Sequence, residues 1–101
     1  MLPKDLLEPL GLDALLVTRP ENVRYLSGFP HPEDAQVLVT GEGAFLLTDP
    51  RYPEAERESR IPAKVLRREE REALLKTLKG RVGFEAEHLP PAPHTHTITK
   101  L

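Results

Sequence analysis

A short proline-rich loop carries the side chains best suited to contact a ligand. It reads Phe29-Pro30-His31-Pro32-Glu33-Asp34 and lies between two segments with regular apolar patterns. Loops held between regular elements often carry binding residues, and His31, Glu33 and Asp34 supply an imidazole and two carboxylates. A solvent-exposed connector explains the same composition equally well. His31, Glu33 and Asp34 are therefore the candidate ligand-contacting residues, with a plain connector as the alternative.

Two segments near the end of the sequence contain candidate metal ligands. His94-Thr95-His96 would place both imidazoles on one side of an extended strand, and Glu85-Ala86-Glu87-His88 gathers carboxylates and an imidazole at a strand end. Protein zinc sites use three or four side-chain ligands, and the histidine pair has no third partner. Charged residues at a strand end are typical of an exposed surface. We therefore assign no residue to a metal.

The sequence contains no motif for nucleophilic catalysis or phosphate binding. Cysteine is absent, and neither serine, Ser27 or Ser59, lies in a Gly-x-Ser-x-Gly turn. Gly41-Glu42-Gly43 lies between two strand patterns, which predicts a hairpin turn and not a nucleotide-binding loop. We expect no catalytic residue in this chain.

Composition limits the class of protein further. The 101 residues suffice for one domain, and a formal charge of −2 with 30% charged residues creates no strong field for nucleic acid or an anionic membrane. No apolar segment approaches the roughly 20 residues of a membrane span, and no cysteine is available for disulfides. We expect a cytoplasmic protein that binds neither nucleic acid nor membrane. The 11 prolines favour a thermophilic source, or simply GC-rich codon usage.

Apolar runs of strand length alternate with amphipathic segments. Expected strands are 14–17, 36–40, 44–48, 63–66 and 81–85, and expected helices are 6–10, 20–27, 52–60 and 68–79. Parallel neighbours need such helical crossovers. The sequence predicts a single α/β domain with three-layer-like architecture, in which helices flank a mixed, mainly parallel sheet of about five strands.

Residues at the expected element boundaries have structural explanations. Asn22 can cap or bridge the turn into the second helix, and Gly28 can end that helix at positive φ. Tyr25 offers an apolar ring that can pack under the hairpin and a hydroxyl that can bond a loop. Asp49 can cap the next helix, and Arg51 can pair either with Asp49 or with a neighbouring turn. None of these roles requires catalysis.

Three blocks of the sequence carry a resemblance when they are taken together: Leu12–Thr18 with Pro20–Phe29, Leu46–Tyr52, and Val82–Leu89. In content and in order they resemble signatures of the creatinase/prolidase N-terminal domain, the family of Xaa-Pro dipeptidases, Xaa-Pro aminopeptidases and creatinases. The resemblance makes Asn22, Tyr25, Gly28, Asp49, Arg51 and Tyr52 members of the structural motif. It implies that residues 1–89 form the family domain. Residues 90–101 would be a Pro/Thr/His-rich tail, either an added edge strand or disordered.

The resemblance also implies what the whole protein does. Relatives join this domain to a C-terminal catalytic domain that holds two divalent metals, usually Mn or Co, on two Asp, one His and two Glu. None of those five ligands is expected before Leu101. In dimeric relatives the loop corresponding to residues 29–34 can reach the partner's active site, so His31, Glu33 and Asp34 become a candidate substrate-gating loop. The resemblance therefore implies a non-catalytic domain of a homodimeric Xaa-Pro peptidase. A stand-alone binding module on the same fold is the alternative.

Overall fold

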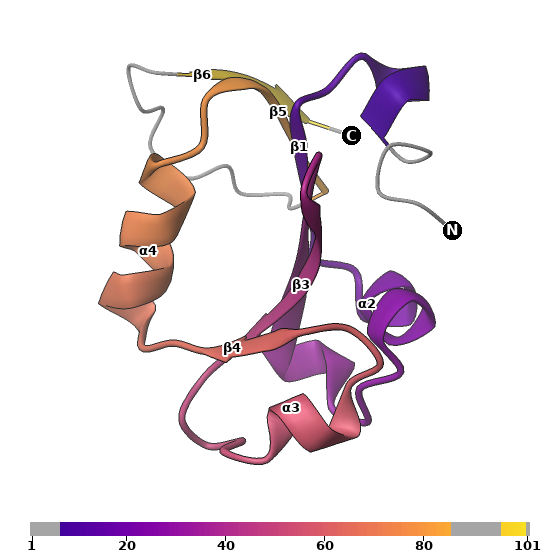
Figure 1. Ribbon diagram of the computed structural model, residues 1–101, viewed down its shortest axis with the longest axis vertical. Coiled ribbons are helices and arrows are strands. Elements are labelled where there is room, and N and C mark those ends of the chain that lie inside the picture. Colours follow the sequence, from indigo (N-terminus) through magenta and orange to yellow (C-terminus); the bar gives the residue numbers. More distant parts are fainter. Residues whose placement is uncertain (1–6, 86–95, 101) are drawn as a thin grey trace.

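The computed structural model describes residues 7–85 and the backbone of residues 96–100. Six strands form one sheet in the order β4-β3-β2-β1-β5-β6 (Figure 1). Their bounds are β1 Ala14–Val17, β2 Ala35–Thr40, β3 Gly43–Thr48, β4 Ala63–Val65, β5 Gly80–Phe84 and β6 His96–Lys100. The boundary expected after residue 89 stays a prediction, since residues 86–95 lie outside the described part.

The sheet is mixed because β2 alone runs against the other strands. It pairs antiparallel with β1 and β3, whereas the β1–β5, β3–β4 and β5–β6 pairs are parallel. The β2–β3 hairpin turns at Gly41 and Glu42, with Thr40 opposite Gly43, as the glycine spacing predicts. The expected α/β class with a mixed, mainly parallel sheet is confirmed.

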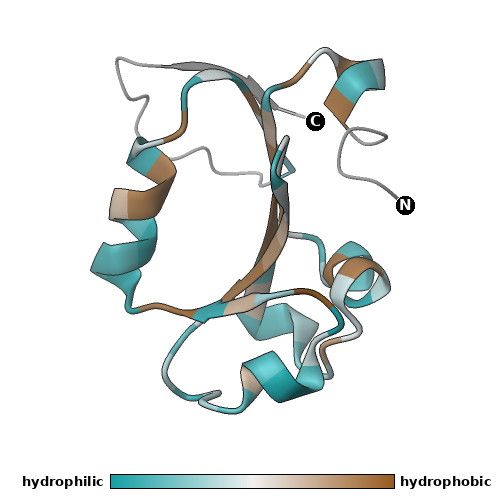
Figure 2. Ribbon diagram, in the orientation of Figure 1, coloured by the Kyte–Doolittle hydropathy of each residue, from teal (hydrophilic) through white to brown (hydrophobic). Residues whose placement is uncertain are grey.

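Two apolar clusters lie on opposite faces of the sheet, because successive side chains of a strand point to opposite faces. One contains Leu15 and Val37 and packs against helices α2 (Pro20–Ser27) and α3 (Ala55–Glu58). The other contains Leu16 and Phe84 and packs against α4 (Arg68–Lys76). Figures 1 and 2 show α4 on one side of the apolar strands and α2 and α3 on the other. The domain therefore has the expected three layers.

Three expected helices are shorter than the sequence pattern predicts. The first is only a 3-10 turn, η1 (Glu8–Leu10), which ends at Gly11 with φ 66°. Helix α3 begins at Ala55 and not at residue 52, because the preceding residues form a turn in which the Tyr52 N–H donates to the Asp49 carbonyl. Helix α4 ends at Lys76, and the Thr77 hydroxyl donates to the Leu74 carbonyl. Gly80 therefore begins β5 and does not end α4.

The start of helix α2 is held by a carboxylate from the far end of the described sequence. Oε1 of Glu85 accepts hydrogen bonds from the Thr18 and Arg19 backbone N–H groups, each at 3.0 Å. Its Oε2 accepts a 2.7 Å bond from the Asn22 side chain. Asn22 thus bridges strand and helix, as expected. Glu85 is partly exposed, in keeping with a surface position at a strand end, and it also satisfies the helix N-terminus where Arg19 provides no side-chain cap.

The prediction for Tyr25 is wrong, whereas that for Gly28 is confirmed. Tyr25 lies on the outer face of α2 and is 67% exposed, because Val23 and Ser27 occupy the buried face of this short helix. Gly28 ends α2 at φ 71°, a conformation that glycine adopts without steric strain. Behind it, Phe29 is fully buried and anchors the start of the candidate loop.

Candidate functional site

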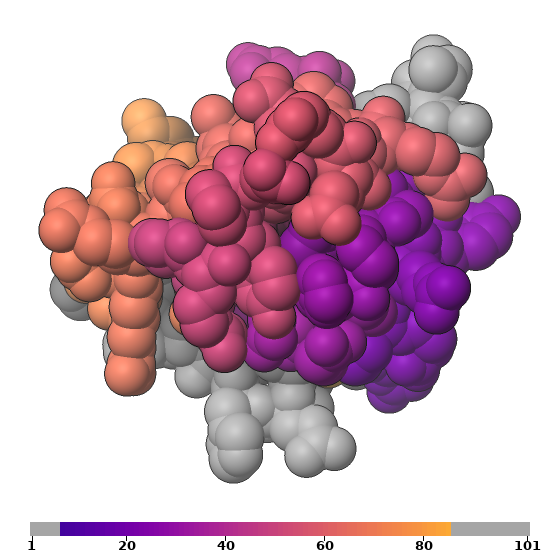
Figure 3. All heavy atoms as spheres, turned by 90° about the horizontal axis from the view of Figure 1, so that it is seen from below, coloured from indigo at the N-terminus to yellow at the C-terminus, as the bar shows by residue number. Residues whose placement is uncertain are grey.

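The candidate residues gather at the edge of the sheet where β1, β3 and β4 end and β2 begins. The segment after β1, the turn after β3 and the loop that enters β2 meet there, since β2 runs in the opposite direction. Figure 3 views the molecule from this edge and shows the loop region beside the turn after β3, with α4 on one side. Ligands of open α/β sheets commonly bind outside the carboxyl ends of the strands. This edge is therefore the natural place for a site.

Asp34 fastens the end of the candidate loop to the sheet. Its Oδ2 accepts a 2.5 Å hydrogen bond from the Tyr52 hydroxyl, and its Oδ1 lies 3.3 Å from Nη2 of Arg51. Its backbone carbonyl accepts a 3.1 Å bond from the hydroxyl of buried Thr48. Asp34 closes the 3-10 turn η2 (Pro32–Asp34), so its contacts fix how the loop enters β2.

Asp49 holds Arg51 in place and does not cap a helix. Its Oδ1 accepts bonds from the backbone N–H (2.9 Å) and Nε (3.0 Å) of Arg51, and its Oδ2 accepts one from Nη2 (2.7 Å). The expected pairing with Arg51 is present, whereas the expected cap is wrong because α3 begins only at Ala55. Hydrogen bonding from Arg51 lowers the pKa of Asp49 below its ordinary value. Asp49 and Arg51 therefore stay charged at neutral pH.

Three aromatic rings, those of Phe29, His31 and Tyr52, pack against one another at the loop. The Phe29 ring meets the Tyr52 ring edge-on, with centroids 5.6 Å apart. The exposed His31 ring stacks on Tyr52 with centroids 4.9 Å apart and planes at 26°. Arg51 lies on the Tyr52 ring as well, with 5.6 Å from its guanidinium carbon to the centroid. Tyr52 thus connects the buried anchor Phe29 to the exposed His31.

The bond from Tyr52 to Asp34 makes the site sensitive to alkaline pH. Donation to the Asp34 carboxylate, together with burial, raises the pKa of the Tyr52 phenol above its ordinary value near 10. Because the folded-state pKa is raised, the bond stabilises the fold below about pH 10, and this contribution is lost as pH rises through the raised pKa. We expect Asp34→Asn to bring the Tyr52 pKa back toward 10.

Ultraviolet titration of tyrosinate measures this effect. A Tyr25→Phe background leaves Tyr52 as the single tyrosine, because the chain has two. Titration of Tyr52 near 10 in that background, or an unchanged midpoint after Asp34→Asn, would refute the proposed coupling.

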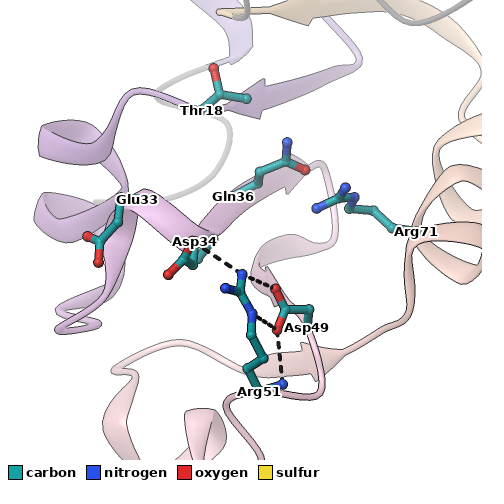
Figure 4. A pocket seen from close by; sticks show the side chains of 8 residues that line it. Thr18, Glu33, Asp34, Gln36, Asp49, Arg51 and Arg71 are labelled. Carbon is teal, nitrogen blue, oxygen red and sulfur yellow. Dashed lines mark hydrogen bonds and ion pairs between the residues drawn. The ribbon is translucent and has the colours of Figure 1, made fainter.

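A polar pocket of about 300 Å³ opens beside this network. Glu33, Gln36 and Arg71 line it together with Asp34, Asp49 and Arg51, and Thr18 and Ala35 complete the wall. Figure 4 shows the side-chain amide of Gln36 and the guanidinium of Arg71 pointing toward one another, with Glu33 on the opposite side of the pocket. The pocket therefore brings together β1, β2, the turn after β3 and α4.

The structure brings some of the expected residues together and leaves others apart. One connected cluster of side chains contains His31, Asp34, Asp49, Arg51 and Tyr52. Glu33 lies beside this cluster. Asn22, Tyr25 and Gly28 instead belong to helix α2 and its ends. The ligand-contacting role of His31, Glu33 and Asp34 stays a prediction.

Sequence reasoning missed Gln36 and Arg71. Gln36 is a polar residue inside an otherwise apolar strand, AQVLVT, and this interruption is the signal that singles it out. Arg71 lies among several charged residues at the start of α4, so its type alone does not distinguish it. Only the crossover from β4 to α4 places it over the pocket.

The described part of the chain has neither a cluster of metal-ligating side chains nor a helix that could span a membrane. Among the side chains of residues 7–85, no three His, Cys, Asp or Glu lie where they could share a metal ion. The His94/His96 pair falls outside these residues. No helix in the described ranges is long and apolar enough to cross a membrane.

Comparison with known proteins defines the class of this domain. The sequence profile of the Creatinase/Prolidase N-terminal domain matches residues 4–101. None of the curated proteins matches the chain significantly. Because the profile covers nearly all of its residues, the chain belongs to the creatinase/prolidase N-terminal domain family.

Solved structures agree with this assignment. A creatinase/prolidase-like N-terminal domain from Corynebacterium diphtheriae is 28% identical with TM-score 0.76, and the match covers 98% of this chain and 92% of that one. The N-terminal domain of the cytoplasmic peptidase PepQ from Mycobacterium tuberculosis H37Rv is 25% identical with TM-score 0.75, over 98% and 88% of the two chains. The prolidase from Pyrococcus horikoshii OT3 is 28% identical with TM-score 0.70 over 87% of this chain. The match spans only 25% of the length of that prolidase.

Proposed function

We propose that the chain is the non-catalytic N-terminal domain of a metal-dependent Xaa-Pro dipeptidase or aminopeptidase, in which it serves oligomerisation and substrate gating. The anchored loop supports the gating role most directly. Asp34 and Phe29 fix its two ends, whereas His31 and Glu33 are exposed at the edge of the sheet. A loop held in this way presents an imidazole and a carboxylate at low entropic cost.

The catalytic metals belong, in this proposal, to a second domain. Two divalent ions, Mn or Co, would polarise the scissile carbonyl and activate water there. The described residues of this chain do not fit such a centre, since they bring no three metal-ligating side chains together. The names of the relatives, prolidase and cytoplasmic peptidase, support the reaction class and a cytoplasmic location. The homodimer and the thermophilic source stay predictions.

The test is steady-state kinetics of the full-length protein that the gene encodes, loaded with Mn²⁺ and assayed on an Xaa-Pro dipeptide. We expect His31→Ala and Asp34→Ala each to lower kcat/KM roughly tenfold, because each disturbs the loop that closes over substrate. Glu42→Ala, at the exposed hairpin turn, is the control and should leave kcat/KM unchanged. Thermal midpoints of all variants separate a gating defect from unfolding.

Two results would count against the proposal. Wild-type kcat/KM in both loop variants would exclude the gating role. Hydrolysis of the dipeptide by the isolated 101-residue chain would exclude the non-catalytic assignment.

A stand-alone binding module is the second candidate function, favoured by the polar pocket that this domain builds from its own residues. The downstream sequence of the gene decides between the two. An Asp, Asp, His, Glu, Glu ligand set beyond residue 101 supports the peptidase, and its absence supports the module.

A further inference from the structure

The pocket beside the loop offers hydrogen-bond donors without partners. Among the side chains of residues 7–85, the Arg71 guanidinium makes no hydrogen bond and no ion pair; its positive charge reaches only Asp49, whose pKa it helps to lower, and it lines the pocket. The other guanidinium, that of Arg51, is already bound to Asp49 and Asp34. Guanidinium groups bind carboxylates through paired N–H donors, so the free Arg71 is the natural partner for an incoming carboxylate.

Gln36 adds a second unsatisfied group. Its Oε1 is shut off from solvent and has no hydrogen-bond partner in the described structure. Buried amide oxygens almost always find a donor, so a partnerless one needs an explanation. Its amide nitrogen also donates to no described residue. Since Figure 4 shows this amide facing Arg71, a half-turn of the amide group that exchanges its oxygen and nitrogen lets the Gln36 N–H2 and the Arg71 guanidinium donate to one ligand between them.

The acidic groups of the pocket decide what kind of ligand fits. Asp49 is saturated by Arg51, and Asp34 is bound by Tyr52 and Arg51. Glu33 has no such partner in the described residues; it lies on the far side of the pocket from Arg71 with its carboxylate turned outward, and its exposed side chain can rotate toward a ligand. Two guanidinium groups face three carboxylates, so the local charge is −1 and opposes a dianion such as phosphate. A ligand with one carboxylate and one ammonium can pair its carboxylate with Arg71 and its ammonium with Glu33.

We propose that this pocket binds a small zwitterion, a free amino acid or a short peptide, with its carboxylate between Arg71 and Gln36 and its ammonium toward Glu33. The volume of about 300 Å³ lies at the lower end of the range for small-molecule sites, which suits a ligand of this size. The lining is polar, which suits a charged ligand better than an apolar one. The site shares Glu33 and Asp34 with the proposed gating loop, but every contact proposed for the ligand lies within residues 7–85, so binding can be tested without a second domain.

NMR titration of the isotope-labelled 101-residue chain tests the site. The readouts are the side-chain signals of the Gln36 amide and the Arg71 Nε–H, which a remote binding event would not move. We expect glycine or glycylglycine to shift both signals, with saturation at a Kd on the order of 1 mM. Whichever of the two binds more tightly identifies the source of the zwitterion. Glycinamide lacks the carboxylate, acetate lacks the ammonium and inorganic phosphate lacks both, so each should bind at least tenfold more weakly.

Variants on α4 give the matched comparison. Arg71→Ala should weaken binding at least tenfold, and Arg71→Lys should retain part of it because the charge remains without the paired donors. Arg68→Ala removes an equal charge from the same helix but pairs with Glu72 outside the pocket, so it should bind like the wild type. Equal Kd values for wild type and Arg71→Ala, or tighter binding of phosphate than of glycine and glycylglycine, would overturn the proposal. This test does not use the kinetics of the full-length enzyme. Failure of the zwitterion proposal can therefore be told apart from failure of the gating proposal.

Discussion

Phe29→Ala is expected to cause the largest loss of stability of any single substitution considered for this domain. The ring is fully buried among α2, α3 and the sheet, and it contacts both His31 and Tyr52. Truncating a buried phenylalanine lowers the free energy of unfolding by about 3–5 kcal/mol, because transfer energy is lost and a cavity remains. Total stabilities of about 5–15 kcal/mol leave little margin for such a loss. Urea unfolding followed by circular dichroism measures it.

Two further variants keep this prediction decisive if Phe29→Ala does not fold. Phe29→Leu retains part of the buried volume and should lose about half as much stability, on the order of 1–2 kcal/mol. His31→Ala removes an exposed ring from the same cluster and should change stability by less than about 1 kcal/mol. Equal effects of Phe29→Leu and His31→Ala would show that Phe29 is not the anchor of the loop.

Gly80→Ala is expected to cause the second largest decrease in the free energy of unfolding. Gly80 has φ 84°, and a Cβ at this position would overlap Oδ2 of Asp13, the atom that accepts the 2.8 Å bond from the Arg81 N–H. Strain at positive φ and displacement of this carboxylate together should reduce the free energy of unfolding by about 2–4 kcal/mol. Thermal and urea unfolding provide the measurement.

Another glycine of the same chain serves as the control. Gly41 has no positive φ and no atom within 4 Å of the point that a Cβ would occupy, so Gly41→Ala should stay within about 0.5 kcal/mol of wild type. Adding Asp13→Ala to Gly80→Ala relieves the steric conflict but not the backbone strain, so the double variant should recover part of the loss. Similar losses at Gly41 and Gly80 would contradict the explanation by close contact.

Most of the sheet was predictable from sequence, because apolar runs such as Ala14–Val17 and the glycine turn after Thr40 specify strands and a hairpin locally. Helix lengths were less predictable. Residues 52–60 are polar enough for an exposed helix, yet the hydrogen bonds of Asp49 and Tyr52 form a turn that delays α3. The prediction that Tyr25 packs under the hairpin is wrong because Tyr25 lies on the side of the eight-residue helix α2 that no other described element covers.

The candidate site was predictable in part. His31, Glu33 and Asp34 stand out because a polar loop interrupts apolar segments, and Asp49, Arg51 and Tyr52 are close together in the chain. Arg71 and Gln36 meet only through the tertiary fold, since 35 positions separate them and neither belongs to a short motif. No local pattern carries that information.

The carboxylate of Glu85 also bears on the order in which this polypeptide acquires its structure. An eight-residue helix is too short to persist alone in water, and the acceptor for the amides at its start is supplied 66 or 67 positions later. During synthesis on the ribosome, the segment that leads into the aromatic loop therefore lacks its closing bonds until β5 has emerged and docked. We therefore expect this end of the sheet to complete its folding late, through long-range contacts that form only once β5 has paired with β1.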